Sequence, residues 1–284
     1  MSAQSTNPLS KYFRQPAIHL TLPSGGKYWP DGSLEMNMSG QLEIYPMTTK
    51  DEITIRTPDA LLNGSSTVSL IQSCIPQIKD AWMAPTIDID AIIIAIRIAS
   101  YGQNMDIDTI CPNQECKHEN RHAMDLTMIL DGVKSPNYNK TVDINNIKIK
   151  LKPVPYFDNN KTKIMAFEQE RAMSIIGDDT LSDEEKITSF QNHLNKIIDI
   201  NTELMAAAVE YVEIEDGIRV SERQHIDEFL NNCDTKIVKA LRTRFEEFNK
   251  FTELPKPRMS CEECGTEYPV ELNFDYANFF VNAS

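Results

Sequence analysis

Four of the six cysteines in this chain stand in two pairs that are far apart in the sequence. The first pair, Cys111 and Cys116, lies in the run Cys-Pro-Asn-Gln-Glu-Cys, and the second, Cys261 and Cys264, lies in Cys-Glu-Glu-Cys-Gly. Structural zinc sites use four thiolate or imidazole ligands, with about two to four residues between the members of a pair. Both pairs have this spacing, and a run of alternating character follows each pair. Two knuckles that each lead into a strand predict a zinc ribbon whose halves are split by a long insertion.

Two histidines that follow the first pair could replace a cysteine as ligand. His118 lies only two residues after Cys116, which is close for an unstrained chelate, and His122 lies in the expected strand, so we interpret both as surface residues. A closed set of four thiolates leaves no position open for water, so the zinc would be structural and not catalytic. The expected ligands of a Zn2+ ion are therefore the four paired cysteines, Cys111, Cys116, Cys261 and Cys264.

The remaining residues that could carry chemistry lack partners in the sequence. Cys74 ends an apolar stretch and is expected to be a small core residue, and Cys233 lies between two expected helices. A nucleophilic enzyme would need His193 or His225 beside a serine or Cys233, together with a carboxylate. The sequence contains no phosphate-binding P-loop, no dinucleotide glycine fingerprint and no His-Glu-x-x-His motif. We therefore interpret the chain as non-enzymatic.

The composition is that of a soluble globular protein, with 284 residues of which 41% are hydrophobic and 25% charged. Its formal net charge is −14. Nucleic-acid binding needs a basic surface that displaces counterions from phosphates, and no stretch here provides one. The longest apolar run, residues 91–99, contains Arg97 and is too short to span a bilayer. No secretory signal is visible, so we expect cytoplasmic synthesis, where paired cysteines hold metal more often than they form disulfides.

Short strands and helices alternate along the chain. We expect a strand at 18–22 and hairpins at 34–38 with 41–45, 105–110 with 121–126, 141–144 with 147–151 and 212–214 with 218–220. We expect a helix capped by Thr48 or Thr49, and further helices at 66–74, 88–101, 160–211 with a break near Gly177, 221–231 and 235–251. Helix 88–101 is almost wholly apolar, so it should be central.

The order of these elements indicates an α+β fold with a helical lobe inserted into the split zinc ribbon. Four regions are expected: a flexible arm at 1–16, an α+β region with the first knuckle at 17–159, the inserted helical lobe at 160–251, and the second knuckle with a C-terminal strand and tail at 252–284. The whole helical stretch lies between the two cysteine pairs. A shared metal ion would therefore close the base of the lobe.

A series of short motifs in the first half of the chain resembles the T4-type bacteriophage baseplate protein family. In order, the motifs are Leu22-Pro-Ser-Gly-Gly-Lys-Tyr28, Pro46-Met-Thr-Thr-Lys-Asp-Glu52, Thr57-Pro-Asp-Ala-Leu-Leu-Asn-Gly64 and the stretch from Asp90 through Arg97-Ile-Ala-Ser-Tyr-Gly102. The cysteine-containing segment that follows is also similar to that family. Its members are baseplate hub or hub-assembly proteins of contractile-tailed phages.

The resemblance implies a structural, hub-associated part of a contractile tail baseplate, made in the host cytoplasm and located in the virion tail. It implies other baseplate or tail proteins as partners, and no catalytic residues. We expect those partners to bind the N-terminal region and the aromatic C-terminus, and we expect no nucleic-acid, membrane or small-molecule partner. Two alternatives stay open: a hub-assembly chaperone that is absent from the mature virion, and a zinc-ribbon nucleic-acid-binding protein.

Overall fold

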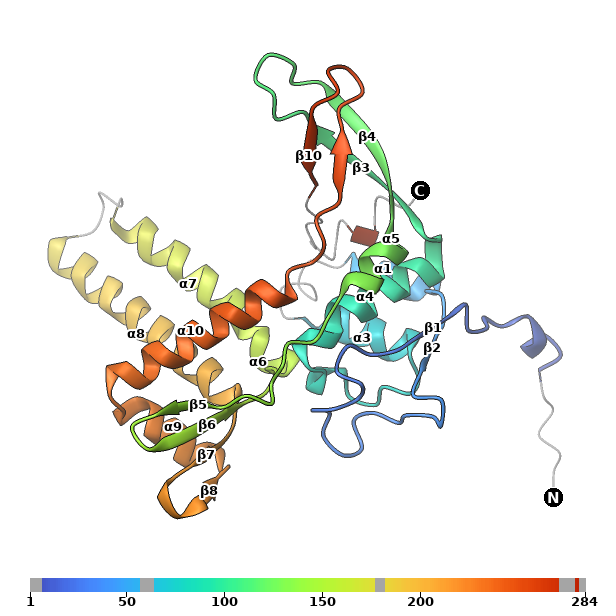
Figure 1. The fold of residues 1–284 in the computed structure, drawn as a ribbon. Helices are drawn as coiled ribbons and strands as arrows, with labels where there is room; N and C mark the ends of the chain where they lie inside the picture. Colours follow the sequence, from blue (N-terminus) through green and yellow to red (C-terminus); the bar gives the residue numbers. More distant parts are fainter. Residues whose placement is uncertain (1–6, 57–63, 177–181, 271–278, 281–284) are drawn as a thin grey trace, which may run out of the picture.

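The computed structural model describes residues 7–56, 64–176, 182–270 and 279–280 (Figure 1). Its helices and small antiparallel sheets confirm the predicted α+β class. The described residues form two hydrophobic cores. Figure 1 shows one core around α4, a helical lobe on one side of it, and two β-hairpins that project from its top.

The first core is built around helix α4, Thr86–Tyr101, as its sequence predicts. Residues 91–98 are all buried, and Gly102 ends the helix with a φ of 89°. Helices α1 (Thr49–Ile55) and α3 (Ser65–Cys74) pack beside it. The capping box expected at the start of α1 is present, because the Thr48 side chain and the Asp51 side chain each accept a hydrogen bond from the other's backbone N–H.

The expected hairpin of 34–38 with 41–45 is wrong. Strand β2, Leu42–Ile44, pairs with β1, Ile18–Leu20, and Leu34 instead forms a bridge with Ile78. Asn37 does build the predicted turn, since its side-chain Oδ1 accepts hydrogen bonds from Ser39 Oγ at 2.6 Å and Gln41 N–H at 3.2 Å. Strand β2 is buried against the first core and pairs there with β1. The segment before the turn is therefore left to contact the loop after α3.

A buried carboxylate fixes the loop that follows β1. Asp88, in the first turn of α4, accepts hydrogen bonds from Ser24 N–H at 2.8 Å, the Ser24 hydroxyl, and Trp29 Nε1–H at 2.8 Å. Burial raises the pKa of the Asp88 carboxyl to about 6, because these three donors only partly offset its loss of solvent. The Pro-Ser-Gly-Gly segment is therefore a turn held against the first core.

The second core lies between a four-stranded sheet and two amphipathic helices. The antiparallel sheet has the order β5 (Val142–Ile144), β6 (Ile147–Leu151), β7 (Val209–Glu213) and β8 (Arg219–Val220). Helices α9 (Arg223–Asn232) and α10 (Thr235–Thr252) supply the other side chains. The two predicted hairpins in this sheet are confirmed, with Asn145 and Asn146 in left-handed turn conformations.

The long helical stretch divides into α7, Lys161–Ile176, and α8, Asp183–Ala207, which pack as an antiparallel hairpin. The capping box of Ser182 and Glu185 begins α8 as expected. The prediction of helix up to residue 211 is wrong, because β7 begins at Val209 and pairs with β6. The expected break near Gly177 lies outside the described residues.

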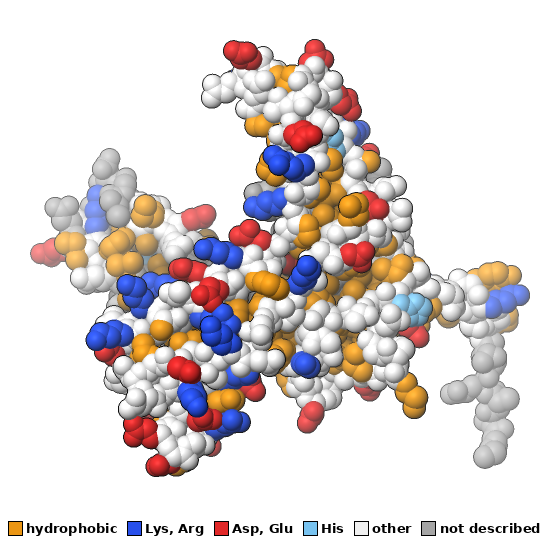
Figure 2. Space-filling view, in the orientation of Figure 1, with side chains coloured by type: hydrophobic (Ala, Val, Ile, Leu, Met, Phe, Trp, Pro, Cys, Tyr) orange, Lys and Arg blue, Asp and Glu red, His pale blue; other side chains and the backbone are white. Residues whose placement is uncertain are grey.

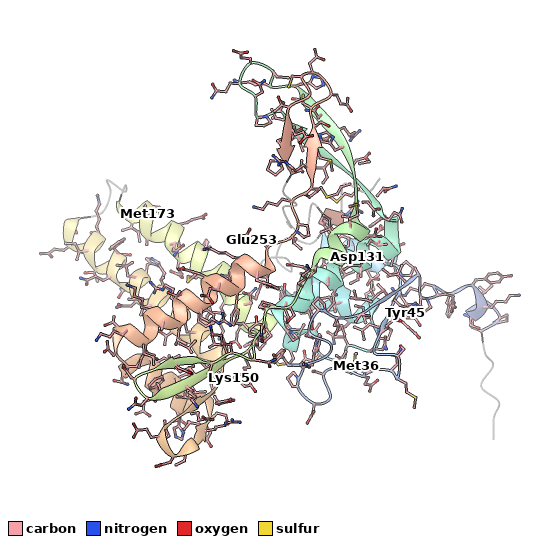
Figure 3. All side chains as sticks on the ribbon, viewed as in Figure 1. Met36, Tyr45, Asp131, Lys150, Met173 and Glu253 are labelled. Carbon is pink, nitrogen blue, oxygen red and sulfur yellow. The ribbon has the colours of Figure 1, made fainter. Side chains whose placement is uncertain are left out.

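Short elements connect these parts. They are the 3-10 turns η1 (Ser10–Tyr12), η2 (Ala81–Met83) and η3 (Glu215–Gly217), and the helices α5 (Leu126–Gly132) and α6 (Tyr156–Asn159). Where α10 ends, the chain runs past α5 and turns toward the top of the molecule; Glu253 and Asp131 mark this passage in Figure 3. Pro255 packs so closely there that a Cβ on Gly132 would lie 2.2 Å from its Cγ.

The aromatic C-terminus was expected to bind partners, but its two described residues are used inside the chain. Phe279 and Phe280 are each 2% exposed and belong to the first core. The buried guanidinium of Arg97 lies 5.4 Å from the ring of Phe279 and 5.5 Å from that of Tyr101. Phe279 covers the Arg97 cation, and Phe280 packs against Phe279 in the same core. The rest of the aromatic segment lies outside the described residues.

Candidate metal centre

Two β-hairpins from distant parts of the chain stand side by side at the top of the molecule (Figure 1). The first is formed by β3 (Asn104–Ile110) and β4 (Glu119–Asp125), which pair in register from Asn104 with Asp125 to Ile110 with Glu119. The second is formed by β9 (Arg258–Ser260) and β10 (Glu267–Pro269). The loop that joins the strands of each hairpin holds one of the two cysteine pairs. Both predicted knuckles therefore lie at the tips of hairpins.

The four paired cysteines come together between these tips. Their Sγ atoms all lie within 4.8 Å of one another. The closest contacts cross between the knuckles, at 3.6 Å for Cys111 with Cys264 and 3.8 Å for Cys116 with Cys261. All four are free thiols. Thiolates that bind a tetrahedral zinc ion at about 2.3 Å have S···S separations of about 3.8 Å, so the sulfur positions fit a metal ion of this kind.

The two knuckles have the same backbone design. In the first, the N–H of Cys111 donates to the carbonyl of His118 at 2.9 Å, and Lys117 has a φ of 49°. In the second, the N–H of Cys261 donates to the carbonyl of Thr266 at 2.9 Å, and Gly265 has a φ of 69°. Each knuckle thus places a left-handed residue directly after its second cysteine. The cysteines of the first pair are further apart in the sequence than those of the second, so the first loop is longer, but both loops contain this turn.

Asn120 joins the two knuckles and was not singled out by its sequence. It is 2% exposed, donates from Nδ2 to the carbonyl of His118 at 3.0 Å, and accepts at Oδ1 from the N–H of Glu262 at 2.9 Å. It also hydrogen-bonds to Cys261, which favours the thiolate there. An asparagine in a strand carries no distinctive signal, so only the tertiary arrangement reveals this role.

Tyr268 joins the hairpins further from the cysteines. Its hydroxyl lies 2.7 Å from Thr109 Oγ1 and 3.1 Å from His122 Nε2. The interaction occupies His122, which is half-buried and was expected at the surface. His118 is also half-buried, and it contributes its backbone carbonyl to the first knuckle. The cluster of possible metal ligands consists of the four cysteine sulfurs, and neither imidazole belongs to it.

The pKa values of the clustered thiols shift in opposite directions. Hydrogen bonding with the Thr266 side chain and with its backbone lowers the pKa of the Cys264 thiol to about 6. The backbone of His118 favours the thiolate of Cys116, but burial and the neighbouring sulfurs outweigh it and raise the pKa of that thiol to about 12. Four thiolates repel one another at this separation. A metal ion would remove that repulsion and release the remaining protons.

The other reactive side chains are placed elsewhere. Cys74 is fully buried, and burial raises the pKa of its thiol to about 12. His193 pairs with the Glu168 carboxylate between α7 and α8. His225 and Cys233 line one shallow depression, but Glu222 holds Nδ1 of His225 at 2.9 Å and burial raises the pKa of the Cys233 thiol. A raised pKa is the opposite of what activates a cysteine nucleophile.

Acidic and basic side chains are interspersed over the face seen in Figure 2, and acidic groups gather at the tip of the hairpins. Among the described residues, no helix has the length and apolar character needed to cross a membrane.

A family model described as T4 bacteriophage base plate protein matches residues 15–281. The match extends through both knuckles and the helical lobe, whereas the motif resemblance rests on the first half of the chain. Comparison with curated proteins and with solved structures gives no match. Because the family model spans nearly the whole sequence, the chain belongs to the T4 bacteriophage base plate protein family.

Proposed function

We propose that this protein is a non-enzymatic, hub-associated component of a contractile tail baseplate, stabilised by a structural zinc ion. Membership of the family supports a structural role in the phage baseplate and a location in the virion tail. The observation that carries the zinc proposal is the meeting of four free thiols from two distant knuckles. Cys111, Cys116, Cys261 and Cys264 would be the ligands, in a split zinc ribbon.

Zinc would act as a closed cross-link with no position for a substrate. The residues around it prepare the site: Asn120 holds the two loops together, and Tyr268 holds the two hairpins in register with each other. The cross-linked cysteines are 145 and 153 positions apart, so the link constrains a long part of the unfolded chain. A baseplate part that must keep its shape under contraction benefits from such a constraint.

We propose that the chain is organised as an arm at 1–16, an α+β region at 17–159, an inserted lobe at 160–251 and a closing segment at 252–284. The β5–β6 hairpin belongs to the second region by sequence, yet it pairs with β7 and contributes Ile149 and Leu151 to the second core. The lobe therefore packs on a hairpin that the preceding region supplies, so the insertion would not be free to move as a separate unit.

The N-terminal arm is the surface that we propose for binding another baseplate protein. Leu9, Tyr12 and Phe13 are 61%, 73% and 57% exposed, and the arm extends away from the body (Figure 1). Arg14 fixes its base by donating to the carbonyls of Pro46 at 2.8 Å and Ser73 at 2.7 Å. An aromatic arm with a rigid base can insert into a partner at a low cost in backbone order.

Metal analysis of the purified protein tests the zinc proposal. We expect one zinc ion per chain in the wild type, and loss of that ion when Cys261→Ser and Cys264→Ser are combined. Cys233→Ser is the matched control, because this cysteine lies outside the cluster, and it should leave the metal content unchanged. Full retention of zinc by the double variant would show that the two pairs do not share an ion.

Quantification in purified virions tests the baseplate role. We expect this chain in a fixed ratio to the other tail proteins, made in the host cytoplasm and retained in the particle. Its absence from mature particles, combined with its presence on assembly intermediates, would favour the hub-assembly chaperone. Affinity for DNA or RNA that falls steeply with salt would favour the nucleic-acid-binding alternative, which the net charge of −14 opposes.

A further inference from the structure

The α7–α8 hairpin leaves a row of apolar side chains of α8 open to solvent. Ile187 is 58% exposed, Leu194 39% and Ile198 61%. Figure 1 shows the hairpin projecting from the second core, and Figure 2 shows hydrophobic side chains at the surface over this part of the molecule. These residues contribute to neither of the two cores. Solvated apolar side chains in a regular row indicate an interaction surface.

The spacing of this row is that of a coiled-coil seam. Exposed residues recur at alternate intervals of four and three, which places them along one stripe of the helix. We call this set the α8 stripe; it consists of Ile187, Gln191, Leu194, Ile198 and Asn201. The neighbouring row already has a partner, because Phe190, Ile197 and Leu204 are partly buried on the side of α8 that faces the rest of the lobe. The stripe is therefore a second, separate apolar face.

The α8 stripe is free of charge. Between residues 187 and 201 the acidic and basic side chains are Lys196 and Asp199, together with the titratable His193. His193 is buried beside Glu168, and Lys196, whose side chain is exposed, also reaches the Glu168 carboxylate. By helical geometry Asp199 lies well away from the centre of the stripe. The positions that flank the stripe on its solvent side are Thr188, Asn195 and Thr202, which are uncharged.

The absence of charge along the stripe favours a second copy of this chain as the partner. Each copy of the chain carries a net charge of −14, so two copies repel each other over most of their surfaces. The stripe brings no like charges together. Coiled coils that choose a different chain as partner use charged flanking positions for that choice, and these positions are uncharged here.

The two polar residues of the stripe also favour a second copy of this chain as the partner. Gln191 and Asn201 would leave amide groups without partners in a purely apolar groove. In a parallel, symmetric pair of α8 helices, each amide meets its own copy and can donate to it and accept from it. A polar residue at an a position of a coiled-coil seam specifies register at a cost in stability, and the spacing of the stripe places Gln191 at such a position.

We propose that the α8 stripe is a homotypic interface through which a second copy of this chain binds in parallel, around a two-fold axis along α8. The interface extends the proposed structural role from a single chain to a dimer. It needs no helix formation on association, since the hairpin is already folded against the second core. The dimer would then present two four-cysteine clusters and two N-terminal arms to the surrounding baseplate.

Sedimentation velocity over a concentration series tests the proposal. We expect the wild type to reach twice its chain mass of 32.3 kDa as its concentration rises to about 100 µM. Leu194→Glu should stay monomeric at all concentrations, because it places two like charges in the seam. The matched control is Met173→Glu on α7, which is 71% exposed and outside the stripe, and it should dimerise like the wild type. Circular dichroism and zinc content establish that the variants are folded.

Oxidative cross-linking tests the parallel register. Leu194→Cys should form a dimer under mild oxidation, because identical positions meet across the axis, whereas Asn192→Cys should not, because it lies to the side of the stripe. A wild type that stays monomeric throughout the series would overturn the proposal and leave the stripe for a helix of another protein. A dimer that forms equally well with Leu194→Glu would also overturn it.

Discussion

The paired β-hairpins and the α7–α8 hairpin both project from the body of the molecule, but they are held together in different ways. The β-hairpins come from segments on either side of the lobe, and they meet through four sulfurs, Asn120 and Tyr268. The α-helical hairpin comes from one continuous stretch and is supported by the Ser182 capping box and by the contact of Glu168 with His193. One projection depends on long-range chemistry, and the other depends on local helical packing.

This difference assigns different roles to the two projections. The β-hairpins join two distant parts of the chain, so their loss would release the C-terminal segment. The helical hairpin can change its outer surface without affecting that connection, which makes it suited to a contact with another molecule. Changes that act on one projection and spare the other therefore test the comparison directly.

Removal of the proposed zinc ion should have the largest effect. In a chain-entropy description, a cross-link that closes a loop of 145 or 153 residues contributes about 5 kcal/mol to the free energy of unfolding. After chelation we expect faster amide hydrogen exchange in β9, β10 and both knuckles, while exchange in α7 and α8 stays unchanged. Equal acceleration in both projections would show that the helical hairpin also depends on the cysteine cluster.

A substitution at the base of the β-hairpins should have the next largest effect. Gly132→Ala places a Cβ 2.2 Å from Pro255 Cγ, so the segment that leads into β9 must shift, and we expect a loss of about 1–3 kcal/mol in the free energy of unfolding. Denaturant titration measures the loss. Adding Pro255→Ala removes the opposing ring and should recover most of the stability. Failure of this second change to rescue the first would show that Gly132 is required for another reason.

The sequence predicts what is local or chemically distinctive. The four cysteines, the capping boxes at Thr48 and Ser182 and the Asn145-Asn146 turn each carry their signal within a few residues, and the structure brings the cysteines together and contains the other three. These features need no knowledge of the rest of the chain, because their geometry is set by neighbouring backbone groups or by side-chain chemistry.

Pairings that depend on the whole fold could not be predicted in this way. The strand that contains Leu42 has two candidate partners, and the choice of β1 depends on which faces the first core buries. The run of alanines before Val209 continues a helical pattern, and only pairing with β6 makes the next residues a strand. Asn120 and Tyr268 are common strand residues until a second hairpin lies beside them.

The body beneath both projections should respond to pH through Asp88. Its folded pKa of about 6 exceeds the usual value of 3.8, so the folded state binds the proton more tightly and this stabilisation is present at low pH and is lost as the pH rises through 6. Between pH 5 and pH 7 we expect this group to reduce the free energy of unfolding by about 1 kcal/mol. Urea titrations of wild type and Asp88→Asn at both pH values isolate the effect.

Asp88→Asn should show a smaller change between the two pH values, even though it loses one acceptor for Ser24 and Trp29 and is less stable overall. An identical pH dependence in the two proteins would assign the effect to other carboxylates. Zinc content should stay the same, because Asp88 lies in the first core and not in the β-hairpins.

The helical hairpin should respond locally to loss of its cap. Ser182→Ala removes the side-chain acceptor for Glu185 N–H, and we expect a cost of about 1 kcal/mol at the start of α8. Amide exchange should rise in the first turns of α8 and stay unchanged in β3 and β4. Release of zinc by this variant would couple the two projections and contradict their independence.

The smallest effect is expected from substitutions at the residue that follows the second cysteine of each knuckle. Both place a left-handed residue after the second cysteine, but the first uses Lys117 where the second uses Gly265. A residue with a side chain pays about 1 kcal/mol to adopt this left-handed conformation. Replacing it by glycine removes that cost, but the greater freedom of glycine in the unfolded chain offsets part of the gain in stability. We therefore expect Lys117→Gly to slow zinc transfer to a chelator slightly, and Gly265→Ala to accelerate it. If both substitutions accelerate transfer, the lysine contributes to the first knuckle through its side chain, and the shared backbone turn does not by itself set the stability of the two loops.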